Sequence, residues 1–219
     1  MTDTDSSMDR PIYNSRIVQP YIQLIRKKYP DLDLSHLLNY AGMKPYEVND
    51  EGHWFSQRQL NRFHEQLVKM TNNNHIARQA GRSAALPECI GAMRQYILGL
   101  VTPRRAFKMI GKAAANFTRS ARYESRRLAR NKYEIIVTPP EAHTEEPFQC
   151  ENRKGFLEAV LTLFNYKLSK IDHPECVFSG DAACRYIVSW EQSFADHFRR
   201  IKNYAFPVFL FSAVLSLLF

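Results

Sequence analysis

The first half of the chain repeats hydrophobic residues with the period of a helix. In residues 15–28 these side chains recur three or four positions apart, which places them on one helical face. They are Ile17, Tyr21, Leu24 and Ile25. Pro30 follows shortly afterwards and would end the helix, because proline interrupts the hydrogen-bond ladder. The pattern predicts an amphipathic helix that packs by one face against a core.

Capping residues mark the ends of further helices. Asp33 precedes residues 34–41 and Gly42 follows them, and these residue types favour the start and the end of a helix, respectively. Ser56 and Gln59 have the spacing of a capping box, in which two side chains satisfy free amide groups of the first turn. Both patterns predict helices whose first residues follow these caps.

Shorter helices complete the first half. One is expected after the turn at residues 72–74, one over residues 93–100, and one after Thr102, where proline stands at the first helical position. Residues 1–12 are polar and acidic with no hydrophobic period, and we expect a disordered leader there. Residues 13–118 are therefore predicted to form an all-helical half.

Beyond residue 118 the hydrophobic period changes to that of strands. Residues 121–128 and 132–138 indicate the two strands of a hairpin. A helix is expected over residues 152–168, followed by a second hairpin with strands at residues 176–178 and 184–190. We predict an α+β fold class, in which a helical N-terminal half precedes a β-hairpin–helix–β-hairpin module.

The C-terminal residues have a different composition from the rest. The α+β module is expected over residues 119–192, and residues 193–204 form a basic linker. Residues 205–219 then run for fifteen positions without a charge. A membrane-spanning helix needs about 20 apolar residues, so we expect the start of such a helix, with packing of this tail on the domain as the alternative. Three basic residues precede it, which predicts an inner-membrane protein with its domain in the cytoplasm: Arg199, Arg200 and Lys202.

Composition and charge exclude several classes of function. The hydrophobic share of 45% and charged share of 24% are those of a folded protein. Part of the net charge of +8 comes from residues 104–132, which we interpret as a solvated surface because no nucleic-acid-binding motif accompanies them. The sequence has no nucleophile elbow, phosphate-binding loop or His-Glu-x-x-His helix. We therefore expect a protein that is not an enzyme and has no nucleic-acid partner.

Three of the four cysteines and one histidine form a candidate metal site. Cys150 precedes the predicted helix, while His173, Cys176 and Cys184 lie in the last hairpin. Cys176 and Cys184 are equidistant from a turn near Gly180, so they would face one another across the strands. Three cysteines and one histidine are a common tetrahedral ligand set for Zn²⁺, and four protein ligands leave no position for a catalytic water. This predicts a structural Zn²⁺ site.

Other interpretations of these residues remain open. Asp172 or Glu175 could replace His173 as the fourth ligand. Cys176 and Cys184 could instead form a redox-sensitive disulfide, or the thiols could be small buried core residues. Cys89 lies far from the others in sequence, which favours simple packing.

The stretch from Cys150 to Trp190 resembles the 4-vinyl reductase domain, which also occurs in the sensory domains of XylR-type activators. The similarity is carried by Cys150, by the helix start at residues 155–158, and by the cysteine–Gly-Asp–Cys-x-Tyr hairpin. In phenol-sensing members, zinc is held by three cysteines and one acidic residue. The resemblance implies that these cysteines correspond to Cys150, Cys176 and Cys184, with His173 in the acidic position.

The helical half resembles the ligand-binding regions of AraC-type regulators and the front ends of bacterial membrane sensors. The segments concerned are LLNYAGM, HWFSQRQLNRF and IARQAGRSA. These resemblances imply a homodimeric sensory domain of a membrane-anchored signalling protein that binds a small hydrophobic or aromatic ligand. The aromatic residues expected to line its cavity are Tyr96, Phe107, Phe117 and Tyr123. The alternative is a lipid-binding or redox-sensing adaptor.

Overall fold

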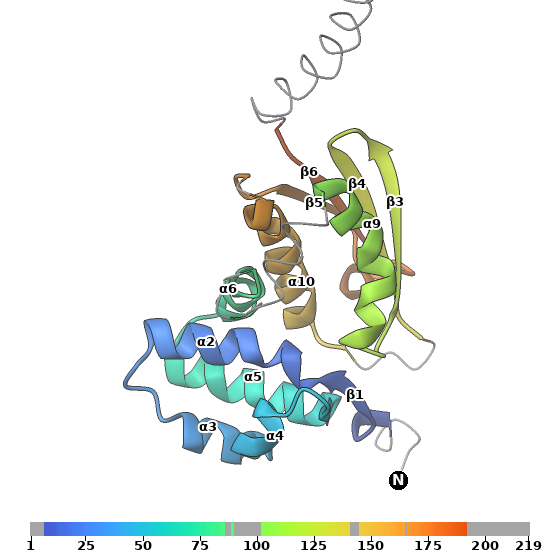
Figure 1. The fold of residues 1–219 in the computed structure, drawn as a ribbon. Coiled ribbons are helices and arrows are strands. Elements are labelled where there is room, and N and C mark those ends of the chain that lie inside the picture. Colours follow the sequence, from blue (N-terminus) through green and yellow to red (C-terminus); the bar gives the residue numbers. More distant parts are fainter. Residues whose placement is uncertain (1–6, 86–88, 90–101, 141–144, 165, 192–219) are drawn as a thin grey trace, which may run out of the picture.

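The fold was obtained as a computed structural model, which describes residues 7–85, 89, 102–140, 145–164 and 166–191 (Figure 1). The first half contains β1 (Pro11–Asn14), η1 (Ser15–Ile17), α2 (Gln19–Lys28), α3 (Leu34–Ala41), α4 (Pro45–Asn49), β2 (Trp54–Ser56), α5 (Gln57–Thr71) and α6 (Ile76–Ser83). The second contains α9 (Pro103–Ala113), η2 (Ala114–Asn116), β3 (Arg122–Ala129), β4 (Lys132–Thr138), α10 (Pro147–Ala159), η3 (Val160–Phe164), β5 (Lys170–Glu175), η4 (Val177–Ser179) and β6 (Cys184–Ser189).

The predicted caps are present in the first half. The Asp33 side chain accepts a hydrogen bond from the backbone N–H of His36 at the start of α3, and Gly42 ends that helix with a positive φ of 67°. Ser56 and Gln59 form the predicted capping box of α5. These helices are therefore positioned by local sequence, and their apolar faces form one core cluster of the molecule.

The sequence predicted that the first half is entirely helical, and this prediction was wrong. Residues 11–14 form β1, which pairs antiparallel with β2. As a result, α2 begins at Gln19, four residues later than expected. Short strands of this kind lack the long alternating pattern that would reveal them in a sequence. The helix predicted over residues 93–100 and residues 1–6 of the predicted leader lie outside the described residues, whereas residues 11 and 12 of that leader belong to β1.

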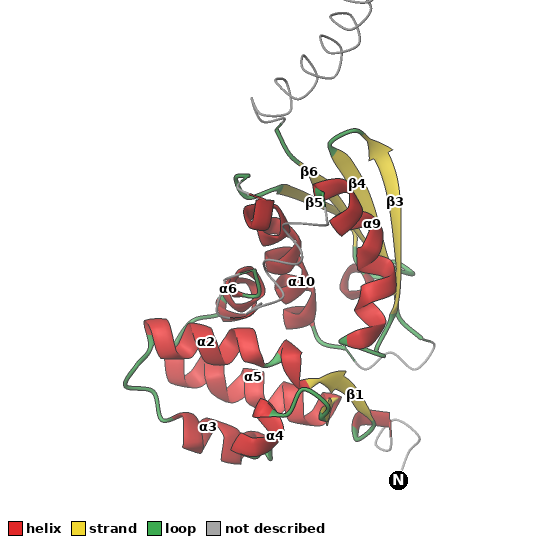
Figure 2. Cartoon of the chain, in the orientation of Figure 1, coloured by secondary structure: helices red, strands yellow, loops and turns green. Residues whose placement is uncertain are grey.

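The second half is an antiparallel sheet with helices α9 and α10 packed against it (Figure 2). Its strand order is β3-β4-β6-β5. The first hairpin is confirmed within one residue at each end. Helix α10 begins at Pro147 instead of residue 152, and the helical geometry tightens after Ala159. The last hairpin also differs, because its first strand ends at Glu175, before Cys176.

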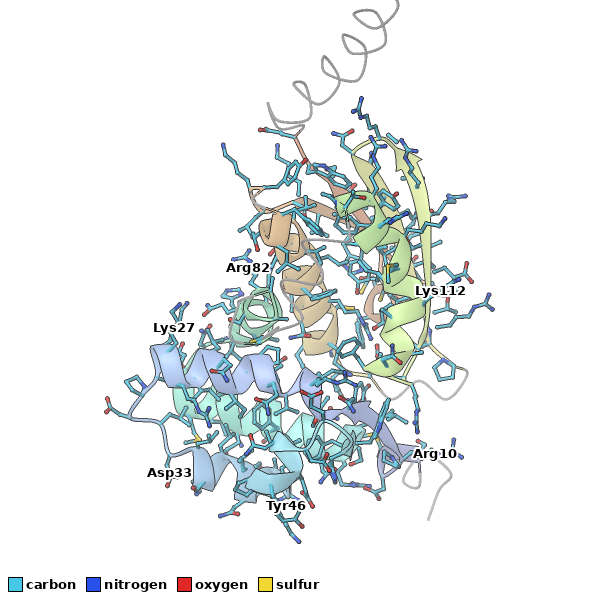
Figure 3. The ribbon with its side chains drawn as sticks, in the orientation of Figure 1. Arg10, Lys27, Asp33, Tyr46, Arg82 and Lys112 are labelled. Carbon is cyan, nitrogen blue, oxygen red and sulfur yellow. The ribbon has the colours of Figure 1, made fainter. Side chains whose placement is uncertain are left out.

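Helices α6 and α10 join the two halves at very close range. A Cβ atom added to Gly155 would lie 2.0 Å from the backbone oxygen of Arg78, and one added to Gly81 would lie 2.1 Å from that of Asn152. Both positions therefore require glycine. Beside this contact, the buried Glu158 of α10 accepts hydrogen bonds from Arg78 and Arg82 of α6. Arg82 lies at this seam in Figure 3.

The α+β fold class is thus confirmed for the part of the chain that the structure describes. None of the helices within these residues is both long enough and apolar enough to span a membrane. The predicted linker at 193–204 and apolar segment at 205–219 lie outside them.

Candidate functional site at a cluster of three thiols

The four residues singled out in the sequence lie together. Cys150 comes from α10, His173 from β5 and Cys184 from the first position of β6, while Cys176 directly follows β5. Their potential ligand atoms all lie within 4.8 Å of one another. The Sγ atoms of Cys150 and Cys184 are 3.4 Å apart, and Cys176 Sγ lies 3.9 Å from the first and 4.0 Å from the second.

Strand alternation explains how the sheet presents these groups to α10. Cys184, Tyr186 and Val188 point to the same face of β6, and all three are buried. The Tyr186 hydroxyl donates a hydrogen bond of 3.1 Å to Cys150 Sγ. At the hairpin turn, the backbone N–H of Cys176 donates to an Asp181 carboxylate oxygen at 2.7 Å. The turn and the strand therefore hold two of the thiols against the helix.

The thiols of Cys150 and Cys184 differ in acidity because one hydrogen bond joins them. This bond lowers the pKa of Cys184, against the effect of burial, and it raises the pKa of Cys150. The favoured form is a Cys184 thiolate that accepts a hydrogen bond from the neutral thiol of Cys150. A thiolate is the reactive form of cysteine towards oxidants and electrophiles.

His173 covers one side of this thiol cluster. Its ring stacks on that of Tyr186, with centroids 4.3 Å apart and planes at 8°. Its Nε2 atom is buried and has no hydrogen-bond partner among the described residues. The His173 imidazole thus lies beside the thiol cluster, and its Nε2 atom makes no hydrogen bond within the described residues.

The residue next to Cys150 connects α10 to the helical half. Gln149 donates a hydrogen bond of 2.6 Å to the hydroxyl of Tyr13, and that hydroxyl donates to Gln57 at 2.5 Å. Gln57 Nε2 in turn donates to Gln149 Oε1 at 3.0 Å. These buried groups belong to β1, α5 and α10. One turn of α10 therefore contacts the thiol cluster through Cys150 and the helical half through Gln149.

A second buried polar group lies on the same helix. Arg153 donates to the hydroxyl of Tyr123 at 2.7 Å and forms an ion pair with Glu145. Glu145 also accepts a hydrogen bond of 2.5 Å from Ser120. The Nη1 atom of Arg153 is buried without a partner in the described part of the chain.

The aromatic residues predicted to line a ligand cavity do not share one among the described residues. Phe107 is fully buried and stacks with Tyr133 and Trp190, at centroid distances of 5.6 and 5.3 Å. Phe117 is 39% exposed under the guanidinium of Arg16. Tyr123 binds Arg153, as described above, and Tyr96 lies outside the described residues.

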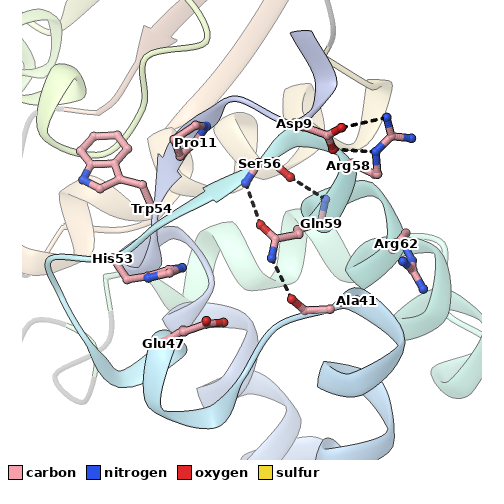
Figure 4. A pocket seen from close by; sticks show the side chains of 11 residues that line it. Asp9, Pro11, Ala41, Glu47, His53, Trp54, Ser56, Arg58, Gln59 and Arg62 are labelled. Atoms are coloured by element: carbon pink, nitrogen blue, oxygen red, sulfur yellow. Dashed lines mark hydrogen bonds and ion pairs between the residues drawn. The ribbon is translucent and has the colours of Figure 1, made fainter. Parts of the chain in front are cut away.

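A cavity does exist at the surface of the helical half (Figure 4). Its volume is about 480 Å³, and its lining includes Trp54 of β2 and the preceding His53. Its lining carries charges of both signs, from Asp9, Glu47, Arg58 and Arg62. It does not border the thiol cluster.

Comparisons with known proteins give a fold but no family. No family model and no curated protein matches the chain. Among solved structures, an H-NOX protein from S. oneidensis in the Fe(II)NO ligation state is 12% identical, with a TM-score of 0.63 over 82% of this chain and 99% of that one. An oxygen-binding H-NOX domain related to soluble guanylate cyclases is 14% identical, with a TM-score of 0.64 over 82% of this chain and 95% of that one. The chain therefore has the fold of these proteins.

This finding corrects the resemblances drawn from the sequence. The structural neighbours are H-NOX domains, and not 4-vinyl reductase, XylR-type or AraC-type domains. The resemblance rested on spaced cysteines and a short hairpin, which different folds can share. The fold of the whole chain, with β1 and β2 in the helical half and α9 packed on β3, outweighs that local similarity.

The predicted cofactor is also corrected. The similar solved structures include studies of haem distortion in the H-NOX family, of haem redox potential and of an Fe(II)NO ligation state. Haem is a different cofactor from a structural Zn²⁺. The prediction of zinc was therefore wrong, although the four residues that suggested it do converge. The cysteines are close enough to hydrogen bond with one another, and Tyr186 bonds to Cys150. Buried thiols also cluster as weakly polar core residues, so their proximity alone does not specify a metal.

A histidine-ligated haem does not fit the described residues either. A haem needs an axial ligand beside a large apolar cavity. The rings of His64 and His173 are each stacked flat against an aromatic ring, at centroid distances of 4.0 and 4.3 Å. The cavity that His53 borders has charged walls. The thiol cluster is thus the reactive centre that the described residues offer.

Sequence reasoning missed the residues that surround this cluster. Tyr186 was noticed only as part of a resemblance, although its spacing of two from Cys184 places it on the same strand face. Gln149 and Arg153 carry no signal of their own, because their partners come from distant parts of the chain.

Proposed function

We propose that this chain is a sensory domain with the H-NOX fold whose responsive centre is the thiol cluster of Cys150, Cys176 and Cys184. The likeness to H-NOX proteins captured with NO and with O₂ supports a domain that responds to small molecules. The observation that carries the proposal is the 3.4 Å separation between the sulfurs of Cys150 and Cys184, from two elements distant in sequence. A small oxidant such as hydrogen peroxide is the expected stimulus.

The chemistry requires only these two residues and the peroxide. The Cys184 thiolate attacks one peroxide oxygen, the O–O bond breaks, and the released hydroxide takes a proton to leave as water. Cys150 then attacks the sulfenic sulfur of Cys184, forms the S–S bond and releases a second water. In total, two thiols and one peroxide give one disulfide and two waters. The S–S bond length of about 2.05 Å requires the sulfurs to approach by more than 1 Å.

We expect the approach of the two sulfurs to change the packing of the helical half. Cys150 lies on α10, whose backbone contacts that of α6 directly at Gly81 and Gly155. Because these backbones have no side-chain layer between them, a shift of α10 has to move α6 or break the contact. The neighbouring Gln149 transmits the same shift to Tyr13 and Gln57. We expect the redox state of the cluster to alter the packing between the halves.

We further propose that the domain is attached to a membrane through residues 205–219 and faces the cytoplasm. The support is the uncharged composition of that segment and the three basic residues shortly before it. The expectations of a homodimer and of no enzymatic activity stay predictions.

The test is a peroxide titration of the full-length chain, followed by mapping of disulfides by mass spectrometry under alkylating conditions. We expect Cys150–Cys184 as the first product. The Cys184→Ser variant should lose peroxide consumption by the cluster, whereas Cys89→Ser should react like the original protein. Unmodified cluster thiols at peroxide levels that oxidise Cys89 would overturn the proposal.

A further inference from the structure

One end of the four-stranded sheet carries basic and apolar side chains together. Strand register places Lys132 and Lys170 on either side of Ser189, at the same level of the sheet. Arg130 lies in the turn that precedes Lys132, and Lys167 lies just before β5. Leu128 and Leu168 are 41% and 49% exposed on the same two segments. We call this the sheet-end surface: Leu128, Arg130, Lys132, Lys167, Leu168 and Lys170.

The chain leaves the sheet at this surface. Trp190, the residue after β6, donates its backbone N–H to the carbonyl of Asn131 at 3.2 Å, and the Asn131 side chain donates to the carbonyl of Trp190 at 2.5 Å. Figure 1 shows the β3–β4 turn and the end of β6 at the same end of the molecule. The route from the folded domain to residues 205–219 therefore begins among these basic and apolar groups.

The charges of the sheet-end surface are not neutralised within the described residues. Its four cations form no ion pair there, unlike Arg126 and Arg185, which both bind the buried Glu134. The nearest carboxylates along the chain are Glu134, two residues beyond Lys132 and already paired with those two arginines, Asp172, two residues beyond Lys170, and Glu191, beyond Trp190. A surface of unpaired lysines around exposed leucines matches an anionic lipid surface, which offers phosphate groups to the charges and hydrocarbon to the leucines.

We propose that the sheet-end surface docks on the anionic headgroups of the membrane to which the chain is attached. This inference rests on the proposed attachment through residues 205–219, which would hold the surface close to the bilayer. Docking would fix the orientation of the α+β half relative to the membrane. Each lysine or arginine near an anionic surface strengthens binding by about fivefold, so several together have a large effect.

The test compares vesicles of neutral phosphatidylcholine with vesicles that contain 30% phosphatidylglycerol, using flotation of the full-length chain at limiting lipid. Capture by neutral vesicles measures insertion of the apolar segment. The additional binding to anionic vesicles measures the attraction of all basic residues near the bilayer, and the variants below assign it to the sheet-end surface or to other residues. We expect half-maximal binding at an at least tenfold lower concentration of anionic than of neutral lipid, and we expect 0.5 M salt to abolish this difference.

Matched variants locate the effect. The triple variant K132Q/K167Q/K170Q should lose the anionic preference. The control R26Q/K27Q/K28Q removes three exposed charges from α2, in the helical half where Figure 3 labels Lys27, and should keep it. An anionic preference that survives in the first variant, or falls equally in both, would overturn the docking proposal. Loss of neutral capture with the preference intact would instead overturn only the attachment through residues 205–219.

Discussion

The cores of the two halves differ in the side chains that they bury, because only the core of the α+β half contains cysteines. The core of the helical half consists of aliphatic and aromatic side chains, and burial lowers the pKa of its His64 to about 4, which keeps that imidazole neutral. The core of the α+β half includes two thiols and the Tyr186 hydroxyl that bonds to one of them. Helix α10 belongs to the second core and touches the first. The difference places the clustered thiols in one half, and α10 is an element through which the helical half can respond to them.

The contact between α6 and α10 gives the largest expected effect. In Gly155→Ala, the new Cβ would meet the backbone oxygen of Arg78, and neither backbone can move without displacing a helix. We expect the free energy of unfolding to fall by about 3 kcal/mol. Denaturant unfolding followed by circular dichroism measures this. The control is Gly52→Ala, where the added Cβ meets only the flexible side chain of Asp50 and the change should stay within about 0.5 kcal/mol.

The ion pairs beside that contact should contribute less to the free energy of unfolding. Glu158→Gln removes the carboxylate that Arg78 and Arg82 share, but both arginines are at least one-third exposed, so water replaces part of the lost interaction. We expect a loss of about 2 kcal/mol in the same unfolding assay. Glu65→Gln breaks an exposed pair with Lys69 and should have no measurable effect. Equal effects of the two variants would show that α6 and α10 do not depend on this pairing.

The same carboxylate predicts how stability depends on pH. Burial raises the pKa of Glu158, but the hydrogen bonds and charges of Arg78 and Arg82 outweigh it, and the pKa lies below its usual value. A lowered pKa in the folded state gives stability that is complete above the unfolded pKa, near 4.3, and is lost as pH falls below it. Unfolding free energies measured from pH 6 to pH 3 should therefore fall less steeply in Glu158→Gln. An unchanged slope would assign the acid sensitivity to other carboxylates.

The smallest effect is expected at the thiol cluster itself. Tyr186→Phe removes the hydroxyl that donates to Cys150 Sγ and keeps the ring that stacks on His173. We expect a loss of about 1 kcal/mol, the usual contribution of one hydrogen bond. Tyr133→Phe, in the same core, serves as the control. A Tyr186 variant as stable as the original would mean that the hydroxyl does not hold Cys150 in place.

Local signals in the sequence predicted much of the fold. The caps at Asp33, Gly42 and Ser56 and the alternation in β4 depend on neighbouring residues only, so they could be recognised without the structure. The pairing of β1 with β2 could not, because it joins residues at least 40 positions apart through strands of three or four residues.

The sequence predicted which four residues lie close together, but not how they pack or what chemistry they support. The cysteine spacing correctly brought Cys150, His173, Cys176 and Cys184 together. It did not show that the shortest sulfur–sulfur distance joins α10 to β6, which depends on how the helix packs on the sheet. Nor did it reveal the role of Gln149, whose partners lie in β1 and α5.

Hydrogen exchange of the full-length chain, compared between the reduced form and the form oxidised by peroxide, tests the central claim most directly. The account predicts faster exchange in α6 and α10, including the seam at Gly81 and Gly155, together with changes next to Tyr13 and Gln57. The Cys150→Ser variant should show none of these changes after the same treatment. Exchange that changes only in β5, β6 and their turn would contradict the claim that oxidation reaches the helical half.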